Sequence, residues 1–206
     1  MHAWYKLTTR DMGPASRCIN KDAPPSQQWQ HPLPWPSSNL VNFDEVKTKL
    51  NELLMLQVPW KVGMFIRLAW QCSSTFRATD YLGGCNGARV RFSPQKDWDV
   101  NVNLDRVLKA LSPIKEQYAP SQLSWADLII LAGSTAIERT GGKKMMFCGG
   151  RTDAAEGGGG PEYLEPRIGS GFQGTDLLNK LRESINLSGL SLREFCLLYT
   201  SDAADE

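Results

Sequence analysis

The polar side chains best placed to do chemistry in this sequence fall in one short stretch, residues 67–71. Arg67 and Gln71 stand four positions apart, so both lie on one face of a predicted helix. By itself, this spacing predicts only an amphipathic helix whose arginine is solvated. It assigns no reaction to either side chain.

Other kinds of site lack essential parts. Gly141-Gly142-Lys143-Lys144 has neither the upstream glycine nor the Ser/Thr after the lysine that a phosphate-binding P-loop needs. The glycines at 157–160 have no predicted strand before them and no predicted helix after them, which disfavours a nucleotide site. The two histidines, His2 and His31, both stand near the start of the chain, so no Ser-His-Asp site is expected.

The cysteines do not have the spacing of a zinc site. No Cys-x-x-Cys pattern occurs among Cys18, Cys72, Cys85 and Cys148, and we therefore predict no metal site. Unpaired cysteines in a domain of this size are typical of a reducing compartment, so the sequence predicts an intracellular protein. Cys72 and Cys85 are expected to be inert small side chains.

The composition is that of an ordinary soluble globular chain. The 206 residues carry 23 Lys+Arg and 22 Asp+Glu, a net charge of +1, with 41% hydrophobic and 22% charged residues. This balance excludes a strongly basic nucleic-acid binder and a polyacidic tail. Because no apolar run reaches the roughly 18 residues of a membrane helix, neither a nucleic-acid partner nor a membrane partner is expected.

Apolar residues recur at helical spacing, and no segment alternates as a strand does. We predict helices over residues 44–56, 60–76, 104–114, 128–138 and 177–185, and hence an all-α fold. The helix over 128–138 is apolar nearly all round, so it is predicted to be buried and central. Long glycine-rich loops are expected over 83–98 and 141–160.

Capping residues predict where these helices begin. Asn42 or Asp44 is expected to cap the first helix, Asn103 the third and Thr175 the fifth. Two pairs have the pattern of a capping box: Ser124 with Asp127, and Ser191 with Glu194 at the start of one more helix.

Two segments lie outside the helical domain. Residues 20–38 hold five prolines, with Trp29 and Trp35 between them, which predicts a stiff, extended linker whose tryptophans dock on a neighbouring surface. A disordered linker is the alternative. Residues 196–206 resemble the translation of a sequencing adapter, and we set them aside as a non-native tail.

Six motifs follow one another along the chain, at residues 67–77, 83–92, 94–98, 101–105, 123–133 and 150–153. Their sequences and their order resemble those of the catalase-peroxidases, haem peroxidases with two tandem homologous halves. Residues 67–77 resemble the distal helix of that superfamily. The resemblance implies a haem-peroxidase-like helical fold that is truncated. It also implies that 1–19 end the first half, that 20–38 link the halves, and that 39–195 are the distal portion of the second.

The resemblance further implies chemistry on hydrogen peroxide with haem b in the parent protein. In that family a distal histidine moves the proton, a distal arginine stabilises negative charge, and a proximal histidine ligates the iron. Arg67 matches the distal arginine, Trp70 the aromatic side chain over the haem, and Asn101 the asparagine that orients the histidine. Gln71 stands where the family has that histidine, and Val100 where the first half has an acidic residue.

These departures imply a supporting role. A glutamine amide does not titrate near neutral pH, so we expect this chain to be inactive, to bind no haem, and to be mostly the non-catalytic half of a catalase-peroxidase. The expected partners of the parent protein are its first half, hydrogen peroxide, small electron donors and a second copy in a homodimer.

Three alternatives stay open at this point. The chain could come from a single-domain ascorbate- or cytochrome-type peroxidase, or it could be a haem-free structural or interaction domain. Arg67, Trp70 and Asn101 could also form a degenerate pocket that still binds haem, with Trp70 stacked on it.

Overall fold

The computed structural model describes residues 2–9, 19, 25, 27, 30, 33–34, 41–56, 59–119, 122–158, 165 and 174–195. The chain divides into two compact units, which are described separately. The core unit comprises Leu33–Ser73 and Gly84–Gly157, and the flanking unit comprises Met1–Pro32, Ser74–Gly83 and Gly158–Glu206.

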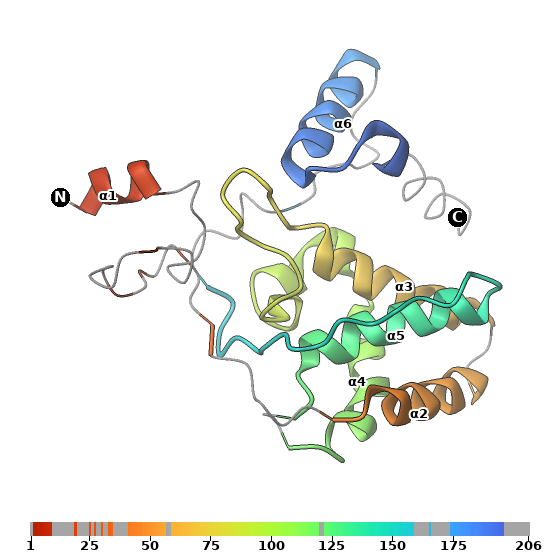
Figure 1. Ribbon diagram of the computed structural model, residues 1–206. Coiled ribbons are helices and arrows are strands. Elements are labelled where there is room, and N and C mark those ends of the chain that lie inside the picture. Colours follow the sequence, from red (N-terminus) through yellow and green to blue (C-terminus); the bar gives the residue numbers. More distant parts are fainter. Residues whose placement is uncertain are drawn as a thin grey trace. The chain divides into compact units, whose positions relative to one another are not determined.

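The described part of the core unit is helical (Figure 1). Its α-helices are α2 (Phe43–Leu56), α3 (Pro59–Ser73), α4 (Leu104–Lys115) and α5 (Trp125–Arg139), with short 3₁₀ turns η4 (Arg89–Arg91), η5 (Gln95–Asp97) and η6 (Asp99–Asn101) between α3 and α4. Among the described residues, β pairing is limited to one isolated parallel bridge, between Gly87 and Asp153. The predicted all-α class is confirmed.

Helix α5 is the centre of the core unit, as its apolar sequence predicts. It packs against α3, α2 and α4, and it lies alongside α3 in Figure 1. Leu128 and Ile129 are fully buried, and the neighbouring helices close the core with Val46, Leu50, Leu54, Phe65, Leu68, Val107 and Leu111. Burial of these side chains is the main source of stability for this unit.

Helices α3 and α5 approach each other closely at Gly133. A Cβ atom built on Gly133 collides with the Cβ of Ala69, so only glycine fits here without a shift of one helix.

We predict that Gly133→Ala destabilises the core unit by about 1–3 kcal/mol, the usual cost of overpacking. In a solvent-exposed helix the same change stabilises by roughly 1 kcal/mol. The sign of the change in the free energy of unfolding therefore tests the contact. Chemical unfolding of Gly133→Ala, with Ser134→Ala on the next, half-buried position as control, measures it. A stabilised Gly133→Ala variant would show that the helices do not approach closely.

An extended segment, residues 143–154, returns along α5 in the opposite direction. Near the end of α5, the backbone N–H of Met145 donates to Glu138 Oε1 at 2.8 Å. The Glu138 carboxylate also pairs with Lys47 of α2, with Nζ to Oε2 at 2.6 Å. Glu138 therefore joins α2, α5 and the returning segment.

These contacts make a pH-dependent contribution to stability. The hydrogen bond from Lys47 and then the N–H of Met145 lower the pKa of Glu138 below its ordinary 4.5. A folded-state pKa below the unfolded one stabilises the fold above the ordinary value, and this stabilisation is lost as the pH falls through the folded-state pKa. Glu138→Gln should therefore lower the unfolding midpoint at neutral pH and have less effect in acid. An equal loss at both pH values would contradict this assignment.

Several helix ends differ from the sequence-based prediction. The predicted helix over 60–76 ends earlier, at Ser73. Asn103 stands at the start of α4 but has a left-handed backbone, φ 69°, and its side chain caps nothing. Thr175 lies inside α6, which begins at Gly174. For α2 the two candidate capping residues were Asn42 and Asp44. Asn42 is the cap, because its Oδ1 accepts from the N–H of Asp44.

The described part of the flanking unit holds α1 (His2–Thr9) and α6 (Gly174–Ser188). Residues 74–83 form a turn closed by Arg77, whose guanidinium pairs with Asp80 at 2.6 Å. The predicted capping box at Ser191 is confirmed: Ser191 Oγ accepts from the N–H of Glu194, and the Glu194 carboxylate accepts from the N–H of Ser191.

Some predictions fall on residues outside the described ranges. These are the docking of Trp29 and Trp35, most of the linker over 20–38, and the tail over 196–206. Within the described residues, no helix has both the length and the apolar character to cross a membrane.

Candidate functional site

Helix α3 and turn η6 carry the site residues predicted from sequence. The two elements are in contact. Arg67 is tied across this contact, because its guanidinium donates to the main-chain carbonyl of Val100 at 2.8 Å. Arg67 is therefore half-buried and bound to the backbone. The spacing alone predicted a solvated arginine, which is not what the structure shows.

Two neutral amides complete this site. Gln71 is 8% exposed on α3, and Asn101 is 3% exposed on η6. The amide nitrogen of Asn101 donates to the carbonyl of Gln95 at 2.6 Å. Gln71 Oε1 and Asn101 Oδ1 are buried and have no hydrogen-bond partner among the described residues, so each oxygen can still accept one.

This donor set does not fit the chemistry of a haem peroxidase. Neither amide can take up a proton near neutral pH, and Arg67 supplies charge but no base. Trp70 lies half-buried on α3, and its indole N–H can donate a hydrogen bond but cannot take up a proton. The one histidine among the described positions is His2, on α1 of the flanking unit, so the described core unit contains no histidine that could ligate haem iron.

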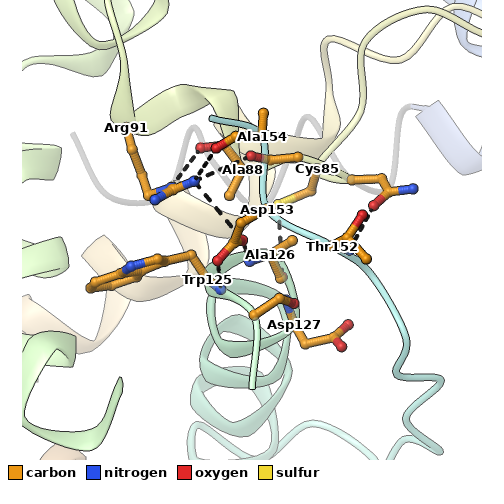
Figure 2. Close-up of polar contacts among 12 residues, drawn as sticks. Cys85, Ala88, Arg91, Trp125, Ala126, Asp127, Thr152, Asp153 and Ala154 are labelled. Carbon is orange, nitrogen blue, oxygen red and sulfur yellow. Dashed lines mark hydrogen bonds and ion pairs between the residues drawn. The ribbon is translucent and has the colours of Figure 1, made fainter. Parts of the chain in front are cut away.

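A second polar centre lies at the start of α5 and was missed at the sequence level (Figure 2). The Asp153 carboxylate accepts from the N–H groups of Trp125 at 2.9 Å and Ala126 at 3.1 Å. Arg91 stands 3.9 Å from the same carboxylate. We call Arg91, Asp153 and these two N–H groups the Asp153 cluster.

Arg91 in turn fixes the chain around it. Its guanidinium donates to the carbonyls of Ala88 at 3.0 Å and Ala154 at 3.2 Å. Burial lowers the pKa of Arg91, and the Asp153 carboxylate acts in the opposite direction. The pKa of Lys115, at the end of α4, is lowered by burial, raised by Asp153 and lowered by Arg91. The charge of Asp153 therefore offsets part of the effect of burial on the pKa of both cations.

Asp127, in the first turn of α5, makes a second set of contacts between this helix and the segment that returns along it. Ser124 caps α5 as predicted, because its Oγ accepts from the N–H of Asp127 at 3.0 Å. The Asp127 side chain does not return to Ser124 as a capping box requires. It accepts instead from the N–H of Gly150 at 2.8 Å and from the guanidinium of Arg151 at 3.0 Å. Through Gly150 and Arg151, the motif at 150–153 thus holds the segment of residues 143–154 on α5.

The predicted unpaired state is wrong for two of the cysteines. Cys72, in the last turn of α3, forms a disulfide with Cys85. Cys148 is free and exposed. The intracellular compartment stays a prediction, but it loses the cysteine argument on which it rested. The thirteen-residue separation of the pair is not a motif that sequence alone distinguishes from two free thiols.

Comparison with known proteins assigns the family. The family model described as Peroxidase matches residues 44–201. This range begins one residue inside α2, covers the later elements of the core unit and reaches into the segment expected to be a foreign tail. The chain belongs to the peroxidase family.

Among individual peroxidases, the chain is similar to catalase-peroxidases. It is 39% identical over 188 residues to one from Pyrenophora tritici-repentis, covering 85% of this chain and 24% of that protein. It is 44% identical over 164 residues to one from Leptospira biflexa, covering 74% and 22%. For one from Escherichia coli the identity is 39% over 167 residues, covering 75% and 22%. The chain thus spans less than a quarter of the length of these curated relatives.

Proposed function

We propose that this chain is part of the non-catalytic, supporting half of a haem-dependent catalase-peroxidase. The parent protein would decompose hydrogen peroxide to dioxygen and water and oxidise small electron donors. In this proposal the core unit packs on the catalytic first half of the same polypeptide, and the parent assembles as a homodimer. The similarity to catalase-peroxidases and the short span of the match support this placement.

Gln71 carries the proposal. It occupies the position of the proton-transferring histidine in the motif that resembles the distal helix, and its amide cannot perform that transfer. Loss of a general acid–base group typically lowers a rate about 10²–10⁴-fold. The contact of Arg67 with the Val100 carbonyl also supports a structural role. It uses guanidinium N–H donors that a distal arginine would direct at the negative charge developing in the transition state.

The purified chain, titrated with haem and then given hydrogen peroxide and a phenolic donor, tests this proposal. We expect no saturable haem spectrum and no turnover above that of free haem. Arg67→Leu should change neither readout. Stoichiometric haem binding, with turnover that Arg67→Leu reduces, would overturn the proposal and favour a degenerate pocket that keeps Arg67, Trp70 and Asn101 for haem.

A further inference from the structure

The Cys72–Cys85 disulfide lies at the junction of two parts of the core unit. Cys72 belongs to the last turn of α3, directly after Gln71. Cys85 directly precedes Asn86 and Gly87, which pair with the 152–154 segment: Asn86 Oδ1 accepts from the N–H of Thr152 at 3.0 Å, and the N–H of Gly87 donates to the Thr152 carbonyl at 2.8 Å. The bond therefore ties the end of α3 to the chain that surrounds the Asp153 cluster, where Figure 2 shows Cys85.

The chain between the two cysteines makes its own closing contacts. The N–H of Arg77 donates to the Leu82 carbonyl at 2.9 Å, and the N–H of Tyr81 donates to the Arg77 carbonyl at 2.8 Å. Gly83, at φ +76°, leaves no room for a Cβ next to the Thr75 carbonyl. These contacts fold residues 75–83 back on themselves. The Cα atoms of Cys72 and Cys85 lie 4.7 Å apart, a separation that a disulfide spans.

Both cysteines are buried. Cys72 is 2% and Cys85 6% exposed, and both belong to the apolar core. A thiol or thiolate has to reach a sulfur atom to exchange a disulfide, so reagents in solution do not have access while the core is packed. This burial argues against a reversible switch and for a bond that is made before the core closes.

We propose that Cys72–Cys85 is a permanent structural disulfide, formed while the chain folds by exchange with a small-molecule or protein disulfide. The two thiols lose two protons and two electrons, the S–S bond forms between them, and the reagent disulfide is reduced to two thiols. The bond holds the end of α3, and with it Gln71, on the Asp153 cluster. The protein therefore matures where thiols are oxidised. This inference does not depend on the proposed function.

Tryptic mapping of the wild-type chain tests the pairing directly. The reduced, unfolded chain is refolded in a glutathione redox buffer, alkylated and digested without reduction. Cleavage after Arg67, Arg77 and Arg89 places the two cysteines in different peptides, 68–77 and 78–89. We expect these peptides to be recovered as one linked pair and Cys148 to be alkylated. Recovery of Cys72 and Cys85 as alkylated peptides, or linked to another cysteine, overturns the proposal.

The permanence of the bond is tested with dithiothreitol on the same folded chain, with and without denaturant. The linked pair should persist in the folded chain and be lost in denaturant. Rapid loss in the folded chain would instead identify an exchangeable switch and overturn the assignment.

Hydrogen exchange provides the positional readout. Cys72→Ala/Cys85→Ala should lose protection at the end of α3 and around residue 87, while the matched control Cys148→Ala keeps it. Unchanged protection in the double variant would show that the bond holds nothing. Should the double variant not fold, the peptide map of the unmodified chain still decides the pairing.

Discussion

Asp127→Ala is expected to lower the free energy of unfolding of the core unit by about 3 kcal/mol. The Asp127 side chain is 1% exposed and accepts hydrogen bonds from the N–H of Gly150 and from Arg151. Removing one member of a buried ion pair costs roughly 3–5 kcal/mol, because the remaining group is left uncompensated. The Arg151 side chain is 31% exposed, so water can solvate it in part, and the expected loss lies at the lower end.

Urea unfolding of the chain, monitored by tryptophan fluorescence, measures this loss, and hydrogen exchange at residues 150–152 localises it. Asp105→Ala is the matched control, because its pair with Lys109 is mostly exposed on α4. Exposed pairs contribute about 0–1 kcal/mol. Equal losses in the two variants, or exchange at 150–152 that does not change, would show that Asp127 does not anchor the returning segment.

The contrast between α5 and its partners explains how much of the fold could be predicted. The 3.6-residue period and the apolar composition of α5 are local properties, so its existence and burial follow from a short window of sequence. Ser124 also acts locally and is predicted correctly. Asp127 has the wrong predicted partner, because Gly150 and Arg151 are more than twenty residues away in the chain, and no local pattern encodes that contact.

The same distinction applies to the candidate site. The positions of Arg67 and Gln71 on one helix face follow from their spacing, and resemblance to a family adds the expected roles. The hydrogen bond from Arg67 to Val100 joins residues 33 positions apart in the chain. The Cys72–Cys85 disulfide joins two residues separated by thirteen positions, with a turn between them. Both require the tertiary fold.

Asp153→Ala is the second substitution with a large expected effect, a loss of roughly 3 kcal/mol. Removing a capping side chain alone costs about 0.5–2 kcal/mol. Here the change also removes the carboxylate 3.9 Å from Arg91, whose charge raises the pKa of Arg91 and of Lys115. Uncompensated buried charge adds to the capping loss. The same urea unfolding experiment measures the total.

Two further variants separate capping from charge compensation at Asp153. Asp153→Asn keeps one acceptor for the α5 N–H groups but removes the charge, so a loss close to that of Asp153→Ala identifies charge as the dominant contribution. Arg91→Met combined with Asp153→Ala removes the cation and the carboxylate together, and neighbours that share an interaction are not additive. The double variant should therefore lose less than the sum of the two single variants. Simple additivity would mean that Asp153 acts on α5 alone, and that the cations beside it are stabilised by the carbonyl groups around Arg91.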